Sequence, residues 1–145
     1  MRFDVENQLS VAQAFTGAAT VSTNSYEKQT AAQDISIGRR MSLLVLPTVA
    51  QGAGSTLTVE VIQATDAALT ASIDVLATRT AIAANMGLGK FLEVPIPPYA
   101  MTKRYIGARL TLASGTTTIT ADIYLVPQDE IAQYKSFPKT NDALV

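Results

Sequence analysis

The chain contains no histidine, no cysteine and no tryptophan among its 145 residues. Without histidine and cysteine it cannot build a Ser-His-Asp or Cys-His catalytic arrangement, and it lacks the commonest ligands of transition metals. Disulfide bonds are excluded because there is no thiol. Aromatic residues make up only 6%, which weakens the case for a stacking platform for sugars or bases. The sequence therefore predicts no cofactor, no metal site and no small-molecule substrate.

Charged residues are also scarce, at 16% of the chain, whereas soluble domains contain about 25%. The formal net charge of -1 offers no general attraction to nucleic acid or to anionic lipid. Residues 1–10 lack the basic start and apolar run of a signal peptide, and no stretch is apolar for the length of a membrane span. We therefore expect a soluble protein, made in a cytoplasm, whose partners are proteins rather than nucleic acids or membranes.

Short segments of alternating apolar and polar residues dominate the sequence. In Ser55 to Gln63 the apolar residues recur every second position, as expected for a strand with one buried face. The segments Arg104 to Leu112, Thr117 to Pro127 and Lys90 to Pro97 show the same period. The side chains predicted to face the core are Leu57, Val59, Val61, Leu92, Val94, Ile96, Ile106, Ala108, Leu110, Leu112, Ile119, Ala121, Ile123 and Leu125.

Four further strands are predicted from weaker signals. Arg39 to Val49 contains a more continuously apolar run than the other segments, which is typical of a strand buried on both faces. Ser72 to Arg79 is a further candidate, and two shorter ones lie at Val21 to Lys28 and at Asp34 to Ile37. The helix-like windows at 66–72 and 81–87 are too short to bury an amphipathic face, so we interpret them as turns.

Two glycine-bearing connections suggest hairpins. Ala113 to Gly115 separates two predicted strands by a tight link, and Gln51 to Ser55 follows the apolar segment in the same way. Seven or eight short strands without intervening helices predict an all-β fold, a single-domain antiparallel β-sandwich over residues 1–127 that includes a short N-terminal arm. Residues 128–145 are polar and lack strand periodicity. We interpret them as a C-terminal tail that is either loose or an arm that docks Tyr134 and Phe137 on a neighbour.

The stretch "KFLEVPIPPYAMTKRYIGARLTL" places three prolines between two predicted strands. Proline has no N–H to donate to a strand ladder, so Pro95 is expected at a sheet edge or bulge. Pro97 and Pro98 then impose a stiff exit. We interpret the segment as a crossover from one sheet to the other that carries Tyr99 and Met101 to the rim of the sandwich.

Five carboxylates lie at polar positions of the predicted strands or beside turns, where solvated side chains are expected. A mechanism that uses carboxylates alone would require two of them to converge in a pocket. These residues are Glu60, Asp66, Asp74, Glu93 and Asp122.

Several segments of the chain follow one another in a characteristic order: "SVAQAFTGAATVSTN" leading to "DISIGRRMSLLV", then "LTVEVIQATDAAL", then "KFLEVPIPP" followed by "KRYIGARLTL". In these segments the chain resembles the Bbp16-like capsid cement (decoration) proteins of tailed bacteriophages. It covers nearly the whole chain to about Pro127. The resemblance implies a jelly-roll-like sandwich that binds the outside of an expanded phage head as a homotrimer and bridges neighbouring major capsid proteins. It implies no catalytic residues, and a location on the virion surface after synthesis in the host bacterial cytoplasm.

The sequence also nominates contact residues for such a role. They lie in the N-terminal arm, at the rim of the sandwich and in the tail: Arg2, Phe3, Asp4, Tyr99, Met101, Lys103, Arg104, Tyr134 and Phe137. A different hypothesis is a carbohydrate- or receptor-binding β-sandwich module of a phage fibre or similar structure, because the same architecture hosts lectins. A glycan array would discriminate between the two.

Overall fold

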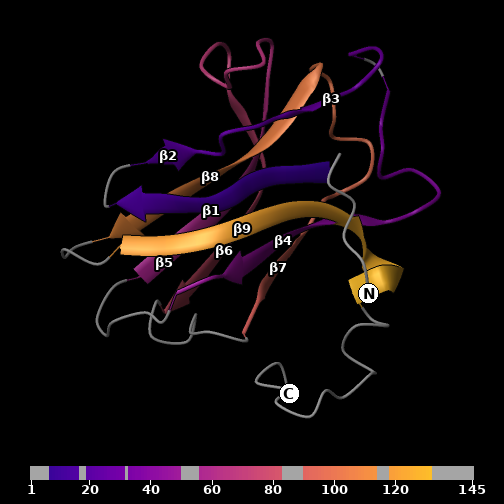
Figure 1. The fold of residues 1–145 in the computed structure, drawn as a ribbon. Helices are drawn as coiled ribbons and strands as arrows, with labels where there is room; N and C mark the ends of the chain where they lie inside the picture. Colours follow the sequence, from indigo (N-terminus) through magenta and orange to yellow (C-terminus); the bar gives the residue numbers. More distant parts are fainter. Residues whose placement is uncertain are drawn as a thin grey trace.

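The computed structural model describes residues 7–16, 19–31, 33–49, 56–82, 90–113 and 118–131. Two antiparallel sheets pack face to face, and Figure 1 shows β1, β9 and β4 in front of β8, β5 and β6. The predicted all-β sandwich is confirmed. The four-stranded sheet has the order β1 (Gln8–Thr16), β9 (Thr118–Pro127), β4 (Met41–Pro47), β7 (Leu92–Pro95). The five-stranded sheet has the order β2 (Thr20–Val21), β8 (Tyr105–Ala113), β5 (Thr56–Ala64), β6 (Asp74–Ile82), and β3 (Tyr26–Glu27) also pairs with β8.

The core lies between the two sheets. Every side chain that the alternating pattern placed inward is buried there, which confirms the predicted faces. Strand β4 is buried on both sides, also as predicted: Leu43 and Val45 face the core, while Leu44 packs with Val126 and Ile131 on the outer face. Ile131 belongs to a helical turn at 128–131 that follows β9 directly, so this turn packs against the sheet.

Both predicted hairpins are wrong. Strand β8 pairs with β5 while β9 pairs with β1 and β4, so the link after Ala113 joins different sheets. Strands β4 and β5 are likewise in different sheets. The alternating pattern fails here because it identifies the buried face of a strand and not its partner. A short glycine-bearing link suits a step between stacked sheets as well as a tight turn. The glycines of both links lie outside the described residues.

The N-terminal third also differs from the prediction. Strand β1 was not predicted, because its pairing with β9 shifts register after Gln8 and again after Ser10, and Ala12 has a φ of 42°. These irregularities break the period of two. The segment 34–37, predicted as a strand, forms turns in which Asp34 Oδ1 accepts from the Ser36 N–H at 2.9 Å. The segment 21–28 contributes only the end of β2 and the two residues of β3.

The loop 65–73 folds over the outer face of the five-stranded sheet. Its segment 66–72 forms turns, as predicted, whereas Ala81 and Ile82 extend β6 and the rest of 81–87 lies outside the described residues. Asp66 stabilises the loop by accepting hydrogen bonds from the Thr70 hydroxyl (2.6 Å) and the Ala71 N–H (2.7 Å). Leu69, at a φ of 59°, is buried with Ile62 and Ala64. Among the described residues no helix has the length and apolarity to cross a membrane.

Leu69 fills the space above Gly107 on β8. A Cβ built on Gly107 would lie 2.2 Å from Leu69 Cδ1 and 3.0 Å from Ser22 Oγ. Because the strand here is covered so closely, only glycine fits beneath the Leu69 side chain. Gly107 lies on the face of β8 that points away from the central core, and the loop buries it there.

We predict that Gly107→Ala lowers the free energy of unfolding by about 1–3 kcal/mol, because Leu69 must move. Chemical denaturation measures the change. Leu69→Ala should also destabilise the protein, by about 2–5 kcal/mol, through the cavity it leaves. The double variant should lose less than the sum of the two single losses, because the new methyl group fills part of that cavity. Strict additivity would contradict this packing.

Candidate interaction surface

The crossover from β7 to β8 spans residues 96–104 and joins the two sheets, as the proline pattern predicted. Strand β7 is the edge of the four-stranded sheet, and Pro95 is exposed at its end opposite Ser42 of β4. The edge position of Pro95 is therefore confirmed. Pro97 and Pro98 follow at once and leave the chain few alternative conformations.

The first half of the crossover is anchored in the core. Ile96 is 1% exposed, its N–H donates to the Met41 carbonyl at 3.0 Å, and its carbonyl accepts from the Ser36 hydroxyl at 3.1 Å. Met101 is 4% exposed and packs in the same core. The segment between Ile96 and Met101 is thus held at both ends by buried side chains.

The second half is held by one side chain of β5. Gln63 is buried, and its Oε1 accepts from the N–H groups of Thr102 (2.8 Å) and Lys103 (3.1 Å). Its Nε2 donates to the Thr102 hydroxyl at 3.1 Å. The amide therefore satisfies two backbone donors that no strand partner reaches, and it fixes the path of the chain into β8.

Tyr99 stands at the apex of this anchored segment. It is 80% exposed, and its φ of 66° lies in the left-handed region that tyrosine rarely adopts. Such a conformation costs about 1–3 kcal/mol and persists only where the surrounding structure imposes it. The arrangement presents an exposed aromatic ring on a backbone with little freedom, which favours a contact role because little entropy remains to be lost on binding.

The two charged residues at the end of the crossover are already paired. Lys103 Nζ lies 2.6 Å from Asp74 Oδ2 and also donates to the Ser72 carbonyl. The hydrogen bond from Lys103 lowers the pKa of Asp74. Arg104 pairs with Glu27 and lies 5.8 Å from the centre of the Tyr105 ring. The crossover thus carries the exposed ring of Tyr99 and two basic side chains that each have an acidic partner within the chain.

The predicted contact residues fall into three groups. Tyr99 and Arg104 are exposed, and the Lys103 side chain is 18% exposed. Met101 is not at the rim, because its side chain fills the core beneath the crossover. The terminal residues Arg2, Phe3, Asp4, Tyr134 and Phe137 lie outside the described residues. Gln63, which holds the crossover in place, was not predicted, because in the sequence it is an ordinary polar residue at the end of a strand.

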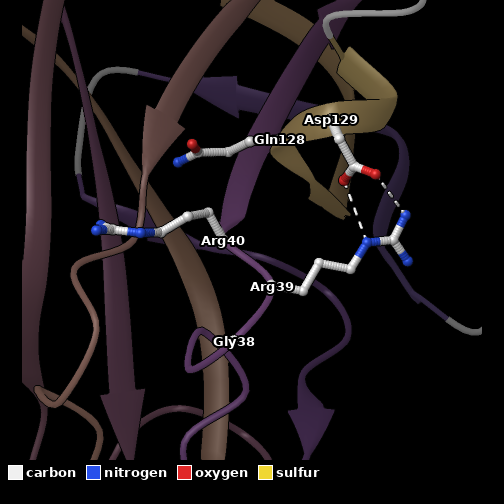
Figure 2. Close-up of a pocket in the computed structure, with 5 residues that line it drawn as sticks. All are labelled: Gly38, Arg39, Arg40, Gln128 and Asp129. Atoms are coloured by element: carbon white, nitrogen blue, oxygen red, sulfur yellow. Dashed lines mark hydrogen bonds and ion pairs between the residues drawn. The ribbon is translucent and has the colours of Figure 1, made fainter.

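A cleft of about 380 Å³ lies where the helical turn meets the start of β4, lined by Gly38, Arg39, Arg40, Gln128 and Asp129. Figure 2 shows Arg39 turned toward Asp129, while Arg40 and Gln128 extend the other way. Arg39 donates to both Asp129 oxygens, at 3.1 and 3.0 Å, and to Glu130 at 3.0 Å. The pairing lowers the pKa of Asp129 and raises that of Arg39. Two residues that line the cleft, Arg39 and Asp129, are therefore already paired with each other.

Each of the five carboxylates considered for acid-base chemistry has a structural partner. Two of them, Asp66 and Asp74, belong to the loop and rim contacts above. Glu60 pairs with Arg109 across β5 and β8 at 2.6 Å, Glu93 accepts from the Ser42 hydroxyl, and Asp122 accepts from the Ala12 N–H. None of the five lines the Arg39–Asp129 cleft. Within the part of the chain that the structure describes, no three His, Cys, Asp or Glu residues gather as a metal site.

Comparison with known proteins gives one family. The Bbp16 family matches residues 9–123, from β1 into β9. No curated protein matches the chain. A solved structure titled "Crystal structure of PirA" is similar with a TM-score of 0.39 and 11% identity, over 79% of this chain and 92% of that chain. A likeness of that size carries no argument about function.

We predict that acid destabilises the fold through three aspartates. Hydrogen bonds from Thr70, Lys103 and Arg39 lower the pKa values of Asp66, Asp74 and Asp129 below the ordinary 3.8. A carboxyl whose pKa is depressed by folding contributes stability that is complete above its unfolded pKa and is lost as the pH falls through its folded pKa. Thermal unfolding measured from pH 6 to about pH 2 should show this loss below pH 4.

The control is the triple variant Asp66→Asn, Asp74→Asn, Asp129→Asn. It should be less stable than the parent at pH 6 and should approach the parent as the pH falls, because its amides do not titrate. A parallel decline of both proteins over the whole range would contradict the assignment.

Proposed function

Because the chain belongs to the Bbp16 family, we propose that it is a capsid cement protein of a tailed bacteriophage. In this proposal a homotrimer binds the outside of the expanded head and bridges neighbouring major capsid proteins. The protein would be made in the host bacterial cytoplasm and would reside on the virion surface. The family match over residues 9–123 is the observation that carries the proposal, because it includes all the strands up to the middle of β9.

The chemistry of the surface supports this role. Stripping water from a charge is costly unless the charge is paired, whereas neutral side chains lose water cheaply. Only 16% of the chain is charged, and at the rim Lys103 and Arg104 already have partners within the chain. A surface of this kind can be buried against neighbours with a small electrostatic penalty.

The rigid crossover supplies an anchor for such a contact. Exposed aromatic side chains that keep one conformation are frequent centres of binding energy in protein interfaces. We propose that Tyr99 contacts the capsid, with Lys103 and Arg104 beside it and Met101 supporting the crossover from the core. The terminal residues Arg2, Phe3, Asp4, Tyr134 and Phe137 stay predictions as further contacts.

Stabilising a capsid in this way requires no covalent bond to be formed or broken. A protein that binds the expanded shell and not its separated or unexpanded forms stabilises that shell by mass action. At a free concentration 100 times the Kd the gain is about 2.7 kcal/mol for each site. Repetition over the many equivalent sites of a head multiplies this gain.

The first test is the mass of the isolated protein. Size-exclusion chromatography with light scattering should give three times the chain mass of 15.4 kDa. A strict monomer at all concentrations would contradict the proposed homotrimer.

The second test is binding to expanded heads that lack the protein, measured by co-sedimentation and by the thermal transition of the heads. The wild-type protein should bind and raise the transition temperature. Tyr99→Ala should fold normally and bind about tenfold more weakly, which is about 1.4 kcal/mol.

Val11→Ala is the matched control for the binding test, because Val11 is a 65% exposed apolar residue on β1. It should bind like the wild type. No binding of the wild-type protein would overturn the proposed function, and equal binding of all three proteins would remove Tyr99 from the contact. If the wild-type protein does not bind heads but recognises sugars on a glycan array, the receptor-binding alternative takes its place.

A further inference from the structure

Lys28 is the only charged residue that is fully buried in the described part of the chain. It is 1% exposed, although Glu27, Gln29 and Thr30 around it are exposed. Its side chain therefore turns inward at the end of β3 instead of extending into water. Because stripping water from an ammonium group is costly, lysine is seldom buried unless other groups compensate its charge. The groups that act on Lys28 therefore explain its position.

One carbonyl and one carboxylate compensate the buried ammonium group. Lys28 Nζ donates to the Ala31 carbonyl at 2.9 Å. Burial lowers the pKa of Lys28 below its ordinary value, and the negative charge of Asp34 offsets part of this shift. Asp34 Oδ1 accepts from the Ser36 N–H at 2.9 Å, whereas Asp34 Oδ2 is buried and accepts no hydrogen bond from the described residues. Lys28 and Asp34 thus carry opposite charges into the fold, and each loses its counter-charge if the other is removed.

The segment that holds these two charges contacts both ends of the crossover from β7 to β8. We call its residues 28–31 and 33–36 the β3–β4 connection. The Lys28 N–H donates to the carbonyl of Arg104, where the crossover ends, at 2.9 Å. The Ser36 hydroxyl donates to the carbonyl of Ile96, where the crossover begins, at 3.1 Å. The two ends of the segment that carries Tyr99 are therefore bonded to the two ends of the β3–β4 connection.

Side chains set the shape of the β3–β4 connection. After Lys28 its described residues lie in turns, bends or irregular structure, so no strand ladder fixes them. The Lys28 ammonium binds the chain three positions on, and the Asp34 carboxylate binds it two positions on. The Gln33 N–H adds one backbone bond, to the Thr30 carbonyl at 3.2 Å. The separation between Lys28 and Ser36 therefore depends largely on the two charged side chains.

We propose that Lys28 and Asp34 are positioning residues for the crossover. Their opposite charges hold the β3–β4 connection in the conformation that fixes both ends of the segment bearing Tyr99. The left-handed φ of Tyr99, 66°, persists only where the surrounding structure imposes it. Gln63 constrains the crossover from β5, and the β3–β4 connection adds a constraint at each end. The inference concerns the isolated chain and does not depend on the proposed cement function.

A double-mutant cycle tests whether the two charges are coupled. Lys28→Met leaves the Asp34 carboxylate without its counter-charge, and Asp34→Asn leaves the Lys28 ammonium without its own. Removing one partner of a buried pair is strongly destabilising, whereas replacing both is often neutral. In chemical denaturation each single variant should therefore unfold at a lower midpoint, and the double variant should be more stable than the less stable single variant. Losses that simply add would overturn the pairing.

Hydrogen exchange and NMR of the double variant test the effect on the crossover. The amides of Ile96, Thr102 and Lys103 should exchange about tenfold faster relative to the amide of Val59 in β5, which is about 1.4 kcal/mol of local opening. The strong nuclear Overhauser effect between the Tyr99 amide and Hα protons, typical of a positive φ, should weaken. A purely structural role would change all amides together. Unchanged crossover amides and an unchanged Tyr99 signal would contradict the proposal.

Lys90→Met is the matched control, because Lys90 is exposed just before β7 and the change removes the same charge. It should leave the crossover amides and the Tyr99 signal as they are in the wild type. A wild-type measurement keeps the test decisive even if the variants do not fold. In low denaturant the amides of Lys28, Ile96 and Thr102 should open together with one free energy. Opening of Lys28 that leaves the other two protected would overturn the proposal.

Discussion

The structure depends on the burial of two one-sided apolar sheets against each other. Strands β1, β4, β5, β7, β8 and β9 all bury apolar side chains in a single cluster between the layers. Because β4 and β5 lie in different sheets, as do β7 and β8 and also β8 and β9, the chain must step repeatedly from one layer to the other. The described step from β7 to β8 runs along the rim of the sandwich. Such connections lie at the surface because the strands that they join fill the core.

The crossover after β7 shows how the core can fix the conformation of an exposed segment. Ile96 and Met101 are buried because they belong to the hydrophobic cluster, and the residues between them must bulge outward. Prolines and the Gln63 amide restrict the path of that bulge, so Tyr99 is exposed in a single strained conformation. The neighbouring charges are satisfied within the chain. The result is an exposed aromatic side chain on a restrained backbone, the feature on which the proposed contact with the capsid rests.

Sequence periodicity predicted the buried faces and failed to predict the strand partners. The face of a residue such as Ile106 or Ile123 follows from local alternation, whereas the pairing of β8 with β5 is decided by residues about fifty positions apart. Strand β1 was not recognised in the sequence because its register shifts disrupt the alternation of buried and exposed side chains. Pro95 was placed correctly because its missing N–H is a local property. The hydrogen bond from the Thr102 N–H to the Gln63 side chain could not be predicted, since the two residues are separated by 39 positions.

We propose that the protein acts through the surface that it buries against an assembled shell. Cryo-electron microscopy of the mature particle tests it most directly. We expect density for this sandwich outside the expanded head, in clusters of three, with the Tyr99 crossover against the capsid proteins. A particle without that density, or with the crossover facing solvent away from every neighbour, would contradict the account.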